Sequence, residues 1–125
     1  MDIDELSEHD LMVFSLVEQL KNENYSSIKA DLNDYDKPDG IHWRNNIPRL
    51  FPDVTARKND TFFIFAVETV DSLSEDHSHH QRLTFSEFAR NTNSVFGLVV
   101  PKRNENIARD ILIEKNIFGE VWGQD

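Results

Sequence analysis

Two acidic residues lie in segments where a carboxylate is unexpected unless it has a chemical role. Asp53 and Glu68 are fifteen positions apart, and every neighbour of Glu68 in residues 65–69 except Thr69 is apolar. By the alternation of a strand, the Glu68 side chain shares a face with Ile64 and Ala66. Because an unpaired buried carboxylate costs several kcal/mol, Glu68 requires a partner, which is a cation, a metal ion or a group of donors.

The segment between these acids predicts how close they lie. Residues 49–57 and 61–69 are typical of strands, and Lys58-Asn59-Asp60 has the composition of a hairpin turn. Antiparallel pairing about this turn sets Asp53 and Glu68 side by side. Adjacent carboxylates repel each other unless a hard divalent cation lies between them, and oxygen ligands suit Mg²⁺ or Mn²⁺. The spacing therefore predicts a shared metal ion.

The first part of the chain predicts a helix, a strand and a loop before the hairpin. Ser7 has the position of an N-cap, and apolar residues follow it at helical spacing through Asn22. Apolar and polar residues alternate over 28–32, which is typical of a strand with one face exposed to solvent. Residues 34–48 contain prolines, a glycine and several Asp and Asn, so we expect a long loop there.

After the hairpin the pattern changes to helices that alternate with strands. Ser78 and Gln81 have the spacing of a capping box at the start of a helix, and we expect the Gln81 side chain to face the sheet. Residues 95–100 form an apolar run typical of a buried strand, Asn104 caps a third helix, and a short strand follows around Trp122. The order αβββαβαβ predicts one α/β domain over residues 1–125, with a mixed sheet flanked by helices.

Composition excludes several classes of protein. Without any Cys, the chain has no disulfide, thiolate zinc site or cysteine nucleophile. Its longest apolar run is far shorter than a membrane helix, and its acidic start lacks the positive region of a secretory signal, so we expect a cytoplasmic protein. The net charge is −10, and residues 1–40 hold 11 acidic and 3 basic residues. A phosphate backbone is repelled by such a charge on average.

The chain resembles the PD-(D/E)xK, or restriction endonuclease-like, superfamily of nucleases, in particular its Holliday-junction-resolvase-like and VRR-NUC-like members. The resemblance covers roughly residues 8–122. It is carried by Pro52-Asp53, by the strand that ends in Val67-Glu68-Thr69-Val70, by Leu73-Ser74 before a helix with Gln81, and by the order of elements.

This resemblance implies a Mg²⁺-dependent hydrolysis of phosphodiester bonds in DNA. In such proteins the Asp and the Glu, here Asp53 and Glu68, bind the metal ion together with the carbonyl of the next residue, here Thr69. A Glu on the first helix sometimes joins them, and Glu18 is the matching candidate. Mn²⁺ is the alternative metal.

The chain departs from the family two residues after the Glu, where Val70 replaces a Lys. That Lys would orient the attacking water and stabilise developing negative charge, which Val cannot do. Gln81, Lys58 or Arg82 could supply a replacement, and Arg57, Lys58 and Arg82 are candidates for contacts with the substrate. Gln81 is the candidate that we place with Asp53 and Glu68 in the catalytic set.

Simpler interpretations stand beside these. Asp53 could be a turn or edge residue, and Glu68 could form an ion pair with Arg57, Lys58 or Arg90. Glu18 could pair with Lys21, three residues along the helix. Gln81 could be only the third residue of a capping box.

Three hypotheses about function follow. The first is a Mg²⁺-dependent nuclease with weak or no turnover. The second is a nuclease-like domain that has lost catalysis and binds protein or nucleic acid. The third is an unrelated acidic domain for protein interaction. The candidate partners are DNA, a second copy of the chain, and a protein that binds the acidic N-terminal segment. A membrane is not among them.

Overall fold

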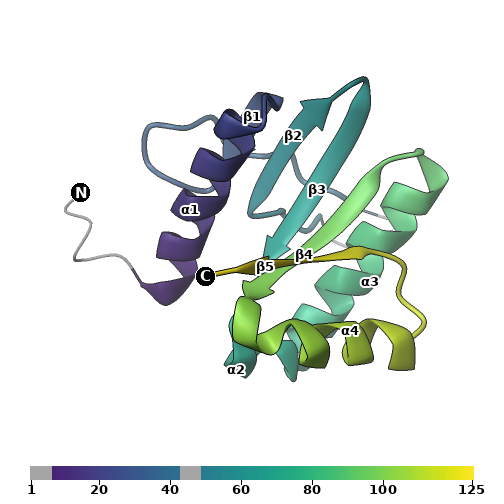
Figure 1. Ribbon diagram of the computed structural model, residues 1–125. Coiled ribbons are helices and arrows are strands. Elements are labelled where there is room, and N and C mark those ends of the chain that lie inside the picture. The colour runs from purple at the N-terminus through teal and green to yellow at the C-terminus, as the bar shows by residue number, and fades with distance from the viewer. Residues whose placement is uncertain (1–6, 43–48) are drawn as a thin grey trace.

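The computed structural model describes residues 7–42 and 49–125, which build a five-stranded sheet with helices on its two faces (Figure 1). The sheet order is β1-β2-β3-β4-β5. The strands are β1 (Ser26–Ala30), β2 (Val54–Lys58), β3 (Thr61–Val67), β4 (Val95–Pro101) and β5 (Glu120–Gln124). The helices are α1 (Glu8–Asn22), α2 (Val70–Leu73), α3 (Asp76–Asn91) and α4 (Glu105–Glu114), with a short 3-10 helix, η2 (Lys102–Asn104).

The sheet is mixed, as predicted. β1, β2 and β3 pair antiparallel, whereas β3, β4 and β5 pair parallel. Parallel neighbours need a crossover connection, and α3 supplies it between β3 and β4 while α4 supplies it between β4 and β5. The predicted α/β class, with helices that flank a mixed sheet, is therefore confirmed.

One face of the sheet is covered by α1. Ser7 caps this helix as predicted, because its Oγ accepts a hydrogen bond from the Asp10 backbone N–H at 3.1 Å. Four apolar residues of α1 that are fully buried pack in one cluster with residues of β1 to β4: Val13, Leu16, Val17 and Leu20. Their strand partners include Phe65 and Val99. Burial of this stripe holds the N-terminal end of α1 in place beside the sheet.

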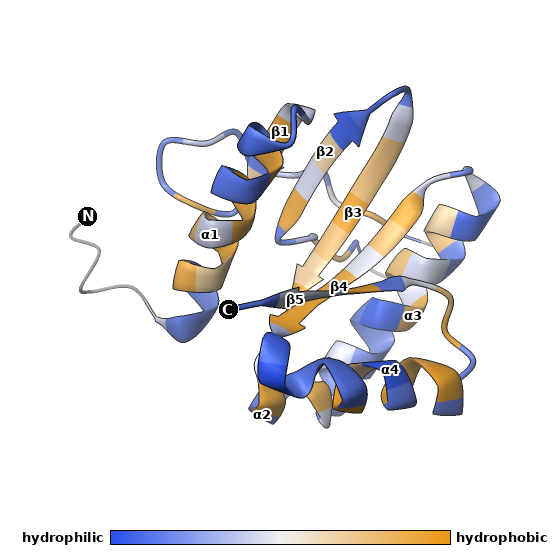
Figure 2. Cartoon of the chain, in the orientation of Figure 1, coloured by the Kyte–Doolittle hydropathy of each residue, from blue (hydrophilic) through white to orange (hydrophobic). Residues whose placement is uncertain are grey.

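The opposite face is covered by α3 and α4. Phe85 of α3 and Leu112 of α4 pack with Ile64, Phe96 and Leu98 of the central strands. β3 and β4 are apolar along most of their length, as strands buried on both faces must be (Figure 2). Among the described residues no helix combines the length and the apolar character needed to cross a bilayer.

The loop before β2 is only partly described. Residues 43–48 of the predicted loop 34–48 lie outside the described residues. Ile41 and Leu50 pair across this region in an isolated antiparallel bridge. β2 begins at Val54, later than the strand predicted for residues 49–57. Pro52 lacks a backbone N–H for the ladder, which accounts for the late start.

The hairpin between β2 and β3 closes on two residues, one fewer than the sequence suggested. Asn59 and Asp60 have φ angles of 52° and 68°, and positive values at both central positions define a type I′ turn. Lys58 therefore pairs with Thr61 as the last rung of the ladder.

This shorter turn changes the pairing of the two acids. Val54 pairs with Phe65, and the same register places Ala66 opposite Asp53. The predicted side-by-side placement of Asp53 and Glu68 is therefore wrong by two residues. Because side chains alternate with a period of two, Glu68 still lies on the predicted face of β3.

The helix that carries Gln81 begins earlier than predicted. α3 starts at Asp76 with Glu75 as its N-cap residue, and Ser78 is buried inside its first turns. Asp76 complements the partial positive charge of the helix N-terminus, which favours a start before Ser78. The capping-box interpretation of Ser78 and Gln81 is therefore wrong.

The type I′ turn generates a test of the register. We expect Asp60→Gly to stabilise the protein by about 0.5 to 1 kcal/mol, because glycine adopts a positive φ without the steric cost of a Cβ. Asp60→Ala should destabilise it. Urea unfolding of the three proteins measures both changes, and equal effects of Gly and Ala would contradict the left-handed conformation of this residue.

Candidate functional site

A polar pocket lies where β2 begins and β3 ends. Asp53 immediately precedes β2 and Glu68 immediately follows β3, so the two acids leave the same end of the hairpin. The pocket has a volume of about 290 Å³ and is lined by His9, Asp53, Val67, Glu68, Thr69, Ser72, Ser78 and Gln81. Four residues singled out from the sequence, Asp53, Glu68, Thr69 and Gln81, thus meet at one pocket.

Both carboxylate oxygens of Asp53 have donors from the protein itself. Oδ2 accepts a hydrogen bond from the Val67 backbone N–H at 2.7 Å. Oδ1 lies 3.0 Å from Nε2 of His9, a residue in the first turn of α1. The Asp53 backbone N–H also donates to the Phe65 carbonyl at 3.0 Å, which fixes the backbone that carries the carboxylate.

His9 is a cation at neutral pH. The hydrogen bond to Asp53 raises the pKa of His9 from 6.5 to about 9, against the opposing effect of partial burial, and Asp10 adds a smaller contribution. His9 Nδ1 lies 3.2 Å from Asp10 Oδ1, so both ring nitrogens face carboxylates. The imidazolium form satisfies both of them because each nitrogen then carries a proton.

Glu68 is held by a buried arginine. Nη1 of Arg82 donates to Glu68 Oε1 at 2.7 Å, and the two side chains are only 2% and 6% exposed. Nη2 of Arg82 donates to the Leu73 carbonyl at 2.9 Å, and Ser72 Oγ donates to Glu68 Oε1 at 3.3 Å. The predicted need of Glu68 for a partner is therefore met, although by an arginine that none of the interpretations had paired with it.

Burial sets the electrostatics of this pair. Removal from water raises the pKa of the Glu68 carboxyl above its ordinary value, and the Arg82 guanidinium opposes that rise. The nearby Asp53 carboxylate adds a small further rise. A buried carboxylate of this kind depends on its counterion, because the interior of the protein screens charge far less than water does.

The arrangement does not fit a divalent cation shared by the two acids. Asp53 and Glu68 are diagonal rather than opposite, and the residue across from Asp53 is Ala66, which offers no ligand. Each acid already has a cationic partner, His9 or Arg82. Mg²⁺ would have to displace Arg82 from Glu68, and from Asp53 it would have to displace His9, which Asp53 shares with Asp10. Among residues 7–42 and 49–125, no three His, Asp or Glu side chains are grouped as ligands for a metal ion.

The other candidate ligand of the metal ion lies elsewhere. Glu18 is nine positions after His9 on α1, about 13 Å along the axis at the usual rise of a helix. It forms an ion pair with Lys21 at 3.6 Å, as the simpler interpretation proposed. The first helix contributes His9 to the pocket instead.

Two of the three candidate substrate contacts are separated from the pocket, and the third is buried beside it. Lys58 and Arg57 are at the turn end of β2, about 15 Å from Asp53 along the strand. The Lys58 ammonium lies 4.9 Å from the centre of the Tyr25 ring, and the Arg57 guanidinium lies 5.1 Å from that of Phe62. Arg82 is 2% exposed and engaged by Glu68.

Sequence reasoning missed His9 and the pairing of Arg82 with Glu68. The only local signal for His9 is an imidazole in the first turn of a helix, next to Asp10. Nothing in the order of residues shows that this turn meets the end of β3. Arg82 follows Gln81 in the chain. Whether its side chain is buried depends on where α3 begins, and the sequence predicted a later start.

Comparison of the chain with models of protein families, with curated proteins and with solved structures finds no match. The resemblance to the nuclease superfamily therefore depends on the residues and the order of elements described above.

The His9–Asp53 contact predicts a measurable titration. We expect His9 to titrate near pH 9 in NMR spectra, and Asp53→Asn to lower this midpoint toward 6.5 because Asp53 is the main cause of the shift. Asp10→Asn, the matched control, should lower it less. Since the folded pKa is raised, the contact stabilises the fold fully below pH 6.5 and loses its effect as the pH rises through about 9. An unchanged midpoint in Asp53→Asn would contradict the contact.

The buried ion pair predicts strong coupling. Arg82→Met leaves the Glu68 carboxylate buried without a counterion, and we expect the free energy of unfolding to fall by about 3 to 5 kcal/mol. The double variant Arg82→Met/Glu68→Leu removes both charges and should recover most of that loss. Urea unfolding of the single and double variants completes the cycle, and additive effects would show that the two side chains do not interact.

Proposed function

We propose that this protein has a restriction endonuclease-like scaffold that acts by binding a partner and not by hydrolysis. The observation that carries this proposal is the neutralisation of Glu68 by Arg82, 2.7 Å away and almost fully buried. A carboxylate that is needed to hold the fold is not free to hold a metal ion.

Two features support a nuclease-like origin of the scaffold. Apart from the additional short helix α2, the order of strands and helices is the one that the resemblance implies. Asp53, Glu68, Thr69 and Gln81, the residues that match the family or accompany its motif, line one pocket. An origin in an unrelated acidic domain gives no reason for these residues to meet.

The charges near the pocket argue against phosphodiester chemistry. Val70, at the position of the family Lys, is 46% exposed and has no charge. Arg82 is the cation next to Glu68, and its guanidinium bonds to Glu68 and to the Leu73 carbonyl. Neither residue offers a free cation to a phosphate, so developing negative charge would not be stabilised.

The class of partner follows from charge. A net charge of −10 repels a nucleic acid, and Arg57 and Lys58 do not adjoin the pocket to offset it. A protein with a basic surface is attracted by the same charge. We therefore propose that the binding partner is a protein.

Mg²⁺-dependent cleavage of DNA is the second candidate. It is favoured by the convergence of Asp53 and Glu68 on one pocket. It requires that a cation replace the imidazolium of His9 beside Asp53, so metal binding would release a proton and become weaker as the pH falls.

A pair of assays separates these candidates. We expect calorimetry with Mg²⁺ or Mn²⁺ to give the same heats for wild type, for Asp53→Asn and for the control Glu18→Gln, because Asp53 and Glu68 are already held by His9 and Arg82. We also expect supercoiled plasmid to be nicked no faster with Mg²⁺ than with EDTA. Metal binding that Asp53→Asn abolishes and Glu18→Gln retains, together with nicking, would establish the nuclease instead.

A further inference from the structure

The strand β5 forms an edge of the sheet. It pairs with β4 on one side, and within residues 7–42 and 49–125 no backbone hydrogen bond reaches it from the other side. An edge strand of this kind presents backbone donors and acceptors at regular spacing, which is a template for another extended chain.

The opposite edge of the sheet is protected by its own geometry. The register of β1 against β2 shifts between Ser26 and Lys29, and Ser27 has a positive φ of 51°. The Ala30 backbone N–H donates to the Asp36 carbonyl at 2.9 Å, so the chain after β1 folds back over this edge. Bulges and covering loops of this kind prevent the addition of strands, and the part of the chain that the structure describes places neither along β5.

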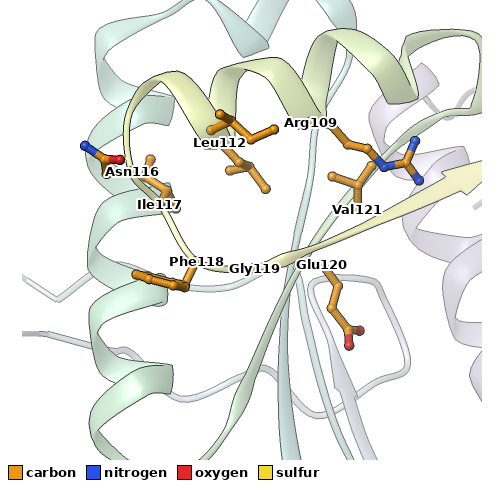
Figure 3. Close-up of a pocket in the computed structure, with 9 residues that line it drawn as sticks. Arg109, Leu112, Asn116, Ile117, Phe118, Gly119, Glu120 and Val121 are labelled. Carbon is orange, nitrogen blue, oxygen red and sulfur yellow. The ribbon is translucent and has the colours of Figure 1, made fainter.

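An apolar groove runs beside β5. It lies between α4, the turn at residues 116–119 and the start of β5, with a volume of about 600 Å³ (Figure 3). Leu112, Ile117 and Val121 line it (Figure 3). Ile113 and Phe118 also line it and are 74% and 61% exposed. Large apolar side chains that are exposed next to one another mark a surface that another molecule covers.

We propose that an extended segment of a basic partner protein pairs with β5 as a sixth strand and places alternate apolar side chains in this groove. The free edge selects a strand, because only an extended backbone satisfies its donors and acceptors. The groove on one side of that edge selects a segment with apolar residues at every second position. This inference takes the class of partner, a protein, from the proposed function.

Charge selects a basic segment over a second copy of the chain. Glu120 begins β5 and lines the groove together with Arg109, and Asp125, which follows the end of β5, lies 3.8 Å from Lys102; both acids are exposed. Two copies would bring together two molecules that each carry a net charge of −10. Lysines that alternate with the apolar residues of a partner would lie near these acids instead.

The test uses capped synthetic peptides and the intact protein. The probe is a heptapeptide in which Lys alternates with Val, with a fluorophore at one end. One control peptide has Pro at its central position, which removes a backbone donor and keeps the charge. A second control has Glu in place of every Lys. We expect the Lys-Val peptide to bind, with hydrogen exchange at residues 120–124 slowed, and both controls to bind at least about tenfold more weakly.

Protein variants then locate the site. Ile113→Asp and Phe118→Asp alter exposed side chains at the groove, so the fold should tolerate them, and each should weaken binding by about tenfold. Ile107→Asp, on the same helix but away from the groove, should change binding less than twofold. Equal losses for Ile107→Asp and Ile113→Asp, equal binding of the Pro peptide, or no binding at about 1 mM peptide would overturn the proposal.

The remaining outcomes identify other occupants. A dimer in sedimentation that Ile113→Asp dissociates would replace the basic segment by a second copy and overturn the proposal. Metal-dependent nicking of plasmid would overturn the proposed function while leaving the peptide result intact, so the two failures are distinguishable.

Discussion

Neutralisation of Glu68 is the constraint on which the rest of the site depends. Its carboxylate leaves the end of β3 at a depth where water cannot stabilise it, and Arg82 reaches it from α3. The same guanidinium binds the Leu73 carbonyl at the end of α2, so one side chain joins β3, α2 and α3. The position of α3 against the sheet, and hence of Gln81 at the pocket, is tied to this contact.

A second charge pair extends this arrangement to the other face of the sheet. His9 belongs to α1, which packs on the face opposite α3, and it meets Asp53 at the end of the hairpin. Two ion pairs from four segments of the chain thereby meet at one pocket, and His9 also contacts Asp10. A metal site would collect negative charge and keep it unpaired until the ion binds. This pocket does the reverse, which is why a role in holding the scaffold explains its residues better than a role in hydrolysis.

Loss of catalysis would leave the surface as the functional part of the molecule. The net charge of −10 and the free edge at β5 favour the same kind of partner, a basic and extended segment. The pocket and the edge are separate features, one at the end of the antiparallel hairpin and the other at the parallel border of the sheet. A scaffold that keeps both could exchange one function for another without a change of fold.

Local patterns in the chain were sufficient for the α/β class, the order of the five strands and the three longer helices, the Ser7 cap and the burial of Glu68, because hydrophobic periodicity and capping act over a few residues. The short helix α2 was not predicted. The same patterns were not sufficient for the hairpin register, the start of α3, the role of His9 or the partner of Glu68. The register depended on backbone angles at Asn59 and its neighbour. The contacts of His9 and Arg82 depended on the packing of whole helices. Arg82 is 14 residues from Glu68 in the chain and His9 is 44 from Asp53, so each pair comes together only when α3 and α1 pack on the sheet.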